Sequence, residues 1–165
     1  MAKWPHVPHC FGWLGLDARG DWYMRDDATQ AAGPFPRSKG SRLRHDKLIE
    51  FIGRNYDADE QGRWFFQNGP QRVFVELEST PHIARITPEL RVHSHNGVWI
   101  EPTQALVDEE GMLYLATDTQ VARVHTMDML QAIDWLEARG WTPNETGAAE
   151  LPLRYGFVRH PAQGA

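Results

Sequence analysis

One short unit occurs three times in this chain: an aspartate, a glycine three residues later, and a large apolar residue two positions further on. The three copies are Asp17-Ala-Arg-Gly20-Asp-Trp22, Asp59-Glu-Gln-Gly62-Arg-Trp64 and Asp108-Glu-Glu-Gly111-Met-Leu113. An aspartate that begins a tight turn accepts hydrogen bonds from nearby backbone N–H groups. Glycine supplies the positive φ that closes a hairpin loop of three or four residues. We therefore predict three hairpin turns of one kind, each of which returns an apolar side chain to the core.

The second copy also resembles the start of a calcium-binding loop. The run Asp57-Ala-Asp59-Glu-Gln61-Gly62 alternates acidic or amide side chains before a glycine, as an EF-hand loop does. That loop requires a bidentate glutamate at its twelfth position and a second helix after it. Here the twelfth position is Asn68, and residues 63–67 have the pattern of a strand. The unit therefore favours a turn over a calcium site.

Most of the chain has the pattern of short strands. The strand pattern is clearest over 63–67 and 71–78, and in the second segment Val73, Val75 and Leu77 share one face. Further strands are expected over 11–16, 21–25, 82–86, 90–93, 98–101, 105–107, 112–116 and 121–124. Residues 28–40 are rich in small side chains, proline and glycine and are expected to form a loop.

Two segments have helical spacing instead. The first spans residues 41–52, with Ser41 as its N-cap. The second begins at the cap Thr126 and ends with Arg139 and Gly140, a cation followed by the residue that most often closes a helix. The predicted fold class is α+β: antiparallel β-hairpins forming one or two sheets with two packed α-helices.

A chain of 165 residues is long enough for one ordinary domain with a core. We expect a single compact domain over residues 1–165. Because each half holds hairpins and one helix, two subdomains, about 1–88 and 89–165, are the alternative.

Charge and composition exclude several classes of protein. The formal net charge of −5 argues against a nucleic-acid partner, because such proteins are usually basic. No apolar run approaches the roughly 20 residues of a membrane helix, and the start of the chain lacks the apolar core of a secretory signal. The lone Cys10 cannot form an internal disulfide. We expect a cytoplasmic protein with neither a nucleic-acid nor a membrane partner.

Histidines provide one metal-site hypothesis. In a strand, His93 and His95 would share one face because side chains alternate with period two. His82, on a neighbouring predicted strand, could complete a three-histidine site for zinc, iron or copper. Eight histidines in the chain produce close pairs by chance, so structural histidines are favoured, and no metal or other cofactor is predicted.

The first half of the chain carries a distinctive motif. It runs Arg54-Asn55-Tyr56, then Gly62-Arg-Trp64-Phe-Phe-Gln-Asn68-Gly-Pro-Gln71-Arg72-Val73, after an earlier Cys10-Phe-Gly-Trp-Leu-Gly-Leu-Asp17. This combination resembles a family of uncharacterised bacterial proteins known only as a domain of unknown function. The resemblance implies a compact bacterial cytoplasmic protein and brings no activity, cofactor or catalytic residue.

The same motif concentrates polar and aromatic side chains around one helix end and one hairpin. The candidate ligand-binding residues are Asn55, Tyr56, Trp64, Asn68, Gln71 and Arg72. The alternative is that these side chains satisfy backbone groups where the helix meets the hairpin.

Three functions remain open at this point. The favoured one is a non-catalytic binding or interaction module, with a homodimer as one form, using a strand edge or an exposed aromatic face. The others are a metal-binding protein or metalloenzyme using His82, His93 and His95, and a small-molecule binding protein with a pocket near Trp64 and Arg72. The sequence has no G-x-S-x-G nucleophile motif and no phosphate-binding glycine loop, and it leaves open whether the protein is an enzyme.

Overall fold

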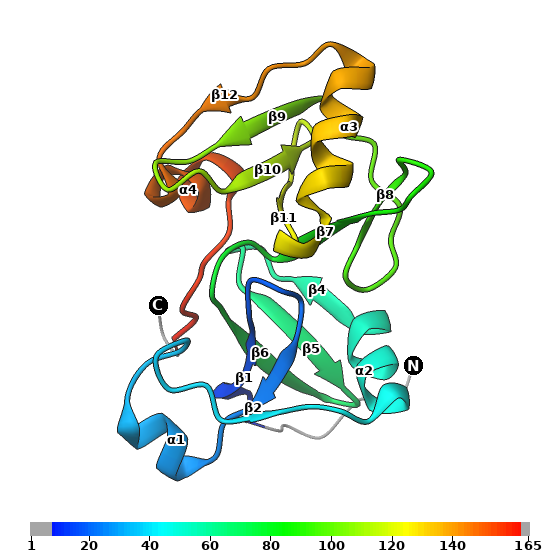
Figure 1. Cartoon of the computed structure of the whole chain (residues 1–165). Coiled ribbons are helices and arrows are strands. Elements are labelled where there is room, and N and C mark those ends of the chain that lie inside the picture. Colours follow the sequence, from blue (N-terminus) through cyan, green and yellow to red (C-terminus); the bar gives the residue numbers. More distant parts are fainter. Residues whose placement is uncertain (1–7, 163–165) are drawn as a thin grey trace. The chain divides into compact units, whose positions relative to one another are not determined.

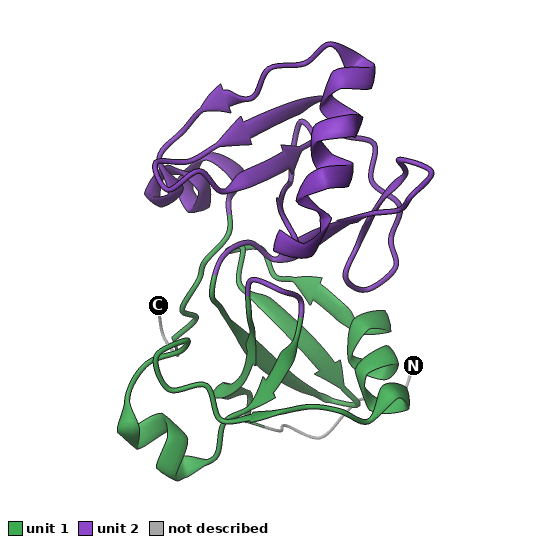
Figure 2. Cartoon of the chain, in the orientation of Figure 1, with its two compact units in different colours: residues 1–17, 21–78, 157–165 green, residues 18–20, 79–156 purple. Residues whose placement is uncertain are grey.

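The structure is a computed structural model that describes residues 8–162. It consists of two compact units, each built around one six-stranded sheet (Figure 2). Among the described residues, unit 1 contains 8–17, 21–78 and 157–162, and unit 2 contains 18–20 and 79–156. The chain passes from unit 1 to unit 2 between residues 78 and 79. It returns to unit 1 at residues 157–162, where two hydrogen bonds hold it. The Leu77 N–H donates to the Arg159 carbonyl, and the Val158 N–H donates to the Gly62 carbonyl.

The sheet of unit 1 has the strand order β3-β2-β1-β6-β5-β4. Figure 1 labels β1, β2, β4, β5 and β6 of this sheet. Its strands are β1 (Cys10–Leu16), β2 (Trp22–Met24), β3 (Ser41–Arg42), β4 (Tyr56–Ala58), β5 (Trp64–Asn68) and β6 (Gln71–Leu77). The helices of this unit are α1 (Asp27–Ala32) and α2 (Asp46–Arg54). Strands β1 and β6 run parallel at its centre, and the other neighbours are antiparallel.

The sheet of unit 2 has the order β12-β9-β10-β11-β7-β8. Its strands are β7 (His82–Ile86), β8 (Val92–Ser94), β9 (Gln104–Val107), β10 (Leu113–Ala116), β11 (Val121–Val124) and β12 (Asn144–Glu145). Its helices are α3 (Met129–Arg139), preceded by a short 3₁₀ turn over Thr126–Asp128, and α4 (Leu151–Tyr155), preceded by another over Ala148–Glu150. The apolar face of α3 buries Ala132, Trp135 and Leu136 against residues of β7, β10 and β11.

The α+β class is confirmed, but two finer expectations are wrong. The sheets are mixed, because β1 pairs with β6, β11 with β7, and β12 with β9 in parallel. Four short helices are present among residues 8–162 instead of two. Helix α1 overlaps the start of the expected loop 28–40. The Asp26 side chain caps it through the Thr29 N–H at 2.8 Å, and its six residues are too few to show a helical period.

The first predicted helix begins later than expected. Ser41 pairs with Met24 as part of β3 and does not cap α2. The cap is His45, whose Nδ1 accepts from the Leu48 N–H at 3.4 Å. The expected end of the second helix is confirmed, since Gly140 closes α3 in the left-handed conformation with φ 66°.

The three repeated units form hairpin turns, as predicted. In each, Oδ1 of the aspartate accepts the backbone N–H four residues later at 2.9 Å, from Asp21, Arg63 and Met112 in turn. The glycines have φ between 80° and 83°. The second carboxylate oxygen of Asp59 bonds Nε of Arg63 at 2.8 Å, so this carboxylate is fully used in closing its turn.

Two further turns follow the same pattern with a hydroxyl residue in place of aspartate. The Arg91 N–H donates to Oγ1 of Thr87 at 3.1 Å, and the Val98 N–H donates to Oγ of Ser94 at 3.0 Å. Threonine and serine thus replace the carboxylate as the side-chain acceptor.

Within residues 8–162 no helix has the length and apolar character needed to cross a membrane.

Candidate functional site

A concave pocket of about 360 Å³ lies in unit 2, between the segment that contains β8 and the C-terminal half of α3. Its lining residues are Leu90, Arg91, Val92, Trp99, Ile100, Glu101, Pro102, Trp135 and Arg139. All of them belong to unit 2, so a single folded unit forms the whole pocket. We call it the Trp99 pocket.

One side of the Trp99 pocket is a stacked pair of side chains from a hairpin. Cζ of Arg91 lies 3.9 Å from the centre of the Trp99 ring. The Trp99 side chain is 54% exposed, and its ring lies nearly perpendicular to that of His93, with the ring centres 5.6 Å apart. The hairpin is held by the Ser94 N–H donating to the Val98 carbonyl and the Ile100 N–H donating to that of Val92. Trp99 is therefore an accessible aromatic surface on an ordered support.

The other side carries a second pair, from the helix. Cζ of Arg139 lies 3.8 Å from the centre of the Trp135 ring, which is expected for residues four apart on one helix face. Trp135 is buried, and Trp141 packs edge-on against it at 5.2 Å. Arg139 is the last residue of α3, where the helix dipole favours a cation.

The electrostatics of the Trp99 pocket are dominated by these guanidinium groups. Neither Arg91 nor Arg139 forms an ion pair with any residue of the range 8–162. Glu101 brings the only carboxylate among the lining residues. The pocket thus combines two cations that form no ion pair, one carboxylate and one exposed aromatic side chain, and the two cations and the ring suit an anionic ligand with a flat ring.

The residues predicted from the sequence lie in unit 1. Asn55 ends α2, where its Nδ2 donates to the Phe51 carbonyl at 2.8 Å and its own carbonyl accepts from the Gln67 N–H. Gln71 Nε2 donates to the Pro8 carbonyl at 2.9 Å, and Asn68 is exposed where β5 meets β6. The Asn55 and Gln71 side chains therefore bond backbone groups.

Two of the predicted aromatic residues are brought together. The rings of Tyr56 and Trp64 lie 4.8 Å apart on the neighbouring strands β4 and β5. The ring of Trp22 lies perpendicular to that of Tyr56, with the ring centres 5.1 Å apart, and burial raises the pKa of the Tyr56 hydroxyl well above its ordinary value. This pair contributes to packing in unit 1.

Arg72 lines a shallow pocket of about 370 Å³ that does not include Trp64. Its guanidinium stacks on Phe65 at 4.3 Å. The other arginine of this pocket, Arg63, is already paired with Asp59 at 2.8 Å. The predicted set is therefore spread over several contacts, and its role in ligand binding stays a prediction.

The three histidines do not form a metal site. His82 and His95 are close, with ring centres 6.0 Å apart, but His93 packs on Trp99. The expectation that His93 and His95 share a strand face is wrong, because β8 ends at Ser94 and His95 lies in the turn. In the described part of the chain, no group of three histidine, cysteine or acidic side chains could hold a metal ion.

The histidine pair serves the packing of unit 2. The Ile83 N–H donates to Nδ1 of His95 at 3.1 Å. Burial lowers the pKa of His82 to about 4. Burial, with repulsion from His82, lowers the pKa of His95 to about 3. Both imidazoles are neutral near pH 7.

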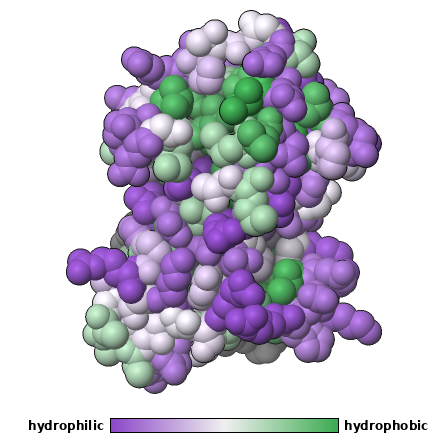
Figure 3. Space-filling model, viewed as in Figure 1, coloured by the Kyte–Doolittle hydropathy of each residue, from purple (hydrophilic) through white to green (hydrophobic). Residues whose placement is uncertain are grey.

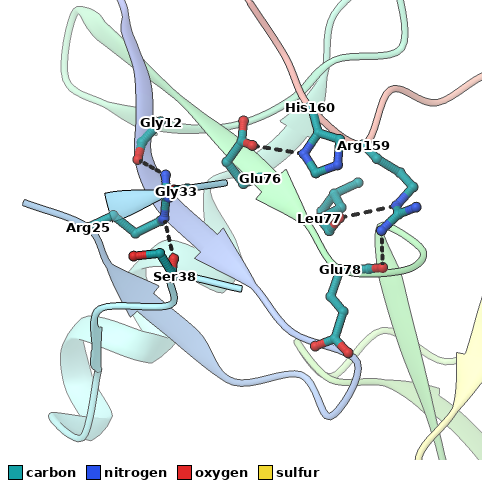
Figure 4. Close-up of polar contacts among 9 residues, drawn as sticks. All are labelled: Gly12, Arg25, Gly33, Ser38, Glu76, Leu77, Glu78, Arg159 and His160. Carbon is teal, nitrogen blue, oxygen red and sulfur yellow. Dashed lines mark hydrogen bonds and ion pairs between the residues drawn. The ribbon is translucent and has the colours of Figure 1, made fainter. Parts of the chain in front are cut away.

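A different polar centre holds unit 1 together (Figure 4). The buried guanidinium of Arg25 donates to the carbonyls of Gly12 at 2.7 Å, Gly33 at 2.8 Å and Ser38 at 3.1 Å. At the returning C-terminal segment, Arg159 donates to the carbonyls of Leu77 and Glu78. These arginines bind protein carbonyls and so have structural roles.

Sequence reasoning missed Arg91, Trp99, Trp135 and Arg139. The Trp135–Arg139 spacing of four on a predicted helix is a signal that could have found one pair. Nothing in the sequence indicates that the hairpin carrying Arg91 and Trp99 faces the end of that helix.

The family model DUF2944, described as a protein of unknown function (DUF2946), matches residues 1–162. The chain belongs to this family. The resemblance to an uncharacterised domain of unknown function is thereby confirmed, and the DUF2944 match gives no catalytic or binding role.

Solved structures similar to the DUF2944 chain are DUF1285 family proteins. The one from Silicibacter pomeroyi DSS-3 has a TM-score of 0.52 and 10% identity, over 79% of this chain and 72% of its own. The one from Shewanella baltica OS155 has a TM-score of 0.45 and 13% identity, over 75% of this chain and 92% of its own. At this identity the first likeness shows the fold alone. No curated protein matches the DUF2944 chain.

Proposed function

We propose that the DUF2944 chain is a small-molecule binding protein whose Trp99 pocket takes a planar anion, an aromatic ring that carries a carboxylate. The observation that carries this proposal is that two guanidinium groups without ion pairs line one pocket with an exposed tryptophan. This proposal takes up the third hypothesis from the sequence, small-molecule binding, but at a pocket other than the one expected near Trp64 and Arg72.

The anionic part of the ligand follows from the two arginines. Each guanidinium has donors in a planar fork that matches the two oxygens of a carboxylate. Arg91 and Arg139 are held in place by the rings of Trp99 and Trp135, so little side-chain freedom is lost on binding. A hydrogen bond to a charged group contributes about 1.5–3 kcal/mol, which corresponds to roughly a 10- to 100-fold gain in affinity.

The aromatic part follows from Trp99. About half of this side chain is exposed beside the arginines, and an aromatic ring that packs on it gains roughly 0.5–1.5 kcal/mol beyond the buried area. The pocket volume of about 360 Å³ is near the lower end of the roughly 300–1,000 Å³ of small-molecule sites. A one- or two-ring compound is therefore the matching size.

Calorimetric titration of the purified chain with naphthoate tests the proposal, with the neutral isostere naphthamide as the control ligand. We expect naphthoate to bind at least ten-fold more tightly. Arg139→Gln and Trp99→Ala should each weaken naphthoate at least five-fold, whereas Glu101→Gln should strengthen it. Arg154→Gln is the matched control variant, because Arg154 also stacks on an aromatic ring, that of Tyr155 at 5.3 Å, outside the pocket. Equal affinity for both ligands would contradict the proposal.

One observation favours a second candidate function, an interaction module. Three apolar residues at spacing three on the exposed side of α3 and its preceding turn, Met127, Leu130 and Ile133, are 70%, 77% and 47% exposed. Figure 3 shows apolar surface gathered on the part of the view that unit 2 occupies.

The homodimer expected from the sequence is tested by sedimentation of the wild type and of Leu130→Glu. A monomer for both would contradict the homodimer.

The remaining sequence predictions are kept as proposals. If naphthoate binds instead at the shallow pocket beside Arg72, Arg72→Gln should weaken its binding and Arg139→Gln should not. A cytoplasmic location is tested by cell fractionation.

A further inference from the structure

Five hairpin turns of the chain share one hydrogen-bonding pattern. In each turn, the side-chain oxygen of the first residue accepts a hydrogen bond from the backbone N–H of the fifth residue. The backbone N–H of the first residue donates in return to the carbonyl of the fifth. The turns are 17–21, 59–63, 87–91, 94–98 and 108–112. Their fourth residue has a left-handed backbone in every case. This common geometry makes the fourth residues directly comparable.

The turn at 87–91 departs from the other four at this fourth position. The others have glycine, namely Gly20, Gly62, Gly97 and Gly111, and this one has Leu90 with φ 64°. Leu90 is the only non-glycine residue with positive φ in the range 8–162. A left-handed backbone is unfavourable for any residue with a Cβ, and leucine lacks the short polar side chain that lets asparagine and aspartate tolerate it. Glycine would fit this turn with less strain.

The side chain of Leu90 has contacts that the strain makes possible. A Cβ at Gly97 or Gly111 would meet nothing within 4 Å, so a side chain there would gain nothing. Leu90 instead is half-buried, packs against the core cluster of unit 2 and lines the Trp99 pocket. The strained residue is thus also a wall of the candidate binding site, and strained backbone residues cluster at such sites.

We propose that Leu90 is the specificity-determining residue of the Trp99 pocket: it supplies the apolar contact that selects a two-ring aromatic carboxylate over a one-ring one. This inference rests on the proposed function. The arginines bind the carboxylate common to both ligands, and Trp99 offers a ring face to either. Leu90 and Val92 both adjoin Arg91 in the lining, but Val92 is buried whereas Leu90 is only half-buried. Leu90 is therefore the one placed to contact the part of a ligand that extends beyond the first ring.

Calorimetry with naphthoate and benzoate on wild type, Leu90→Ala and Leu90→Gly tests the inference. Wild type should prefer naphthoate. Both variants should reduce the ratio of the two affinities at least five-fold while benzoate affinity changes less than two-fold. Urea unfolding of the same variants is the structural readout: Leu90→Gly should be at least as stable as Leu90→Ala, because only the alanine keeps a Cβ on the left-handed backbone.

The outcomes separate the two proposals. An unchanged naphthoate-to-benzoate ratio in folded variants, with naphthoate still bound, overturns the role of Leu90 and leaves the proposed function intact. Absence of naphthoate and benzoate binding by the wild type overturns both. An equal loss of both ligands in folded variants also overturns the inference, because it assigns Leu90 a general role in shaping the pocket.

Discussion

The hydroxyl of Tyr114 donates a hydrogen bond of 2.7 Å to Oδ2 of Asp108, while Oδ1 of the same carboxylate closes the hairpin turn between them. Tyr23 makes the same bond to Asp17, six residues earlier, at 3.1 Å. Burial alone would raise the pKa of Asp108, but the hydrogen bonds from Tyr114 and from the Met112 and Glu110 N–H groups hold it below its ordinary value. One side chain therefore joins a turn to the strand that follows it.

This relationship gives a stability prediction. Tyr114→Phe leaves one oxygen of the buried Asp108 without its donor, which should cost roughly 1–3 kcal/mol of the free energy of unfolding. Tyr23→Phe is the matched control and should cost less, because its bond is longer and its ring is only half-buried. Urea denaturation midpoints measure both. Equal costs would show that burial does not decide the strength of this contact.

The buried histidine pair predicts a pH dependence of stability. His82 and His95 have pKa values of about 4 and about 3 in the folded protein, below the 6.5 of the unfolded chain. The unfolded state therefore binds more protons below pH 6.5, and stability falls as the pH drops from 6.5 toward 4. We expect a loss on the order of 2–4 kcal/mol by about pH 5.

The matched variants are His82→Gln and His95→Gln. Each should remove part of the dependence of the free energy of unfolding on pH. Guanidinium unfolding of the wild type and of both variants at pH 7, 6 and 5 measures this dependence. A flat free energy of unfolding between pH 6.5 and 5 in the wild type would be incompatible with two buried neutral imidazoles.

Two glycines with positive φ should respond differently to alanine. At Gly97, φ is 86° and a Cβ would meet nothing within 4 Å, so Gly97→Ala should cost about 1–2 kcal/mol from the backbone alone. At Gly40, φ is 91° and a Cβ would stand 2.2 Å from the carbonyl oxygen of Met24. Because backbone must move, Gly40→Ala should cost at least twice as much. Thermal unfolding compares the two, and similar melting temperatures would contradict the clash.

We predict that position 25 requires a guanidinium group. Its three bonds to carbonyls come from one planar fork, whereas a lysine offers a single ammonium on a shorter reach. Arg25→Lys should therefore destabilise unit 1 by about 2–4 kcal/mol and speed proteolysis within residues 33–40. Arg44→Lys, at an exposed position, is the control. Unchanged cleavage rates in Arg25→Lys would show that this segment is held by other contacts.

The parts of the fold that depend on neighbouring residues could be predicted from the sequence. The strands β7 and β11 and the three Asp-x-x-Gly turns follow from alternation and from turn chemistry within five residues. The parallel pairings could not be predicted, because β1 and β6 are separated by more than fifty residues and no local pattern specifies their partner. Helices α1 and α4 are too short to show a period.

The candidate site was missed for the same reason. The predicted polar residues of unit 1 are close in sequence. In the structure, the Asn55 side chain bonds the Phe51 carbonyl, and the Gln71 side chain bonds the carbonyl of Pro8, which precedes β1. The Trp99 pocket instead combines a hairpin with a helix about forty residues later. Sequence proximity finds turns and caps, whereas a pocket requires knowledge of which elements meet.

The interrupted course of unit 1 has a consequence for the order in which the chain folds during synthesis. All of unit 2 has been made before residues 157–162 exist, and these residues supply the partners of the Leu77 N–H and the Gly62 carbonyl. The bonds that close unit 1 can therefore form only after every residue of unit 2 has been synthesised. The half of the protein that begins first is therefore the half that is finished last.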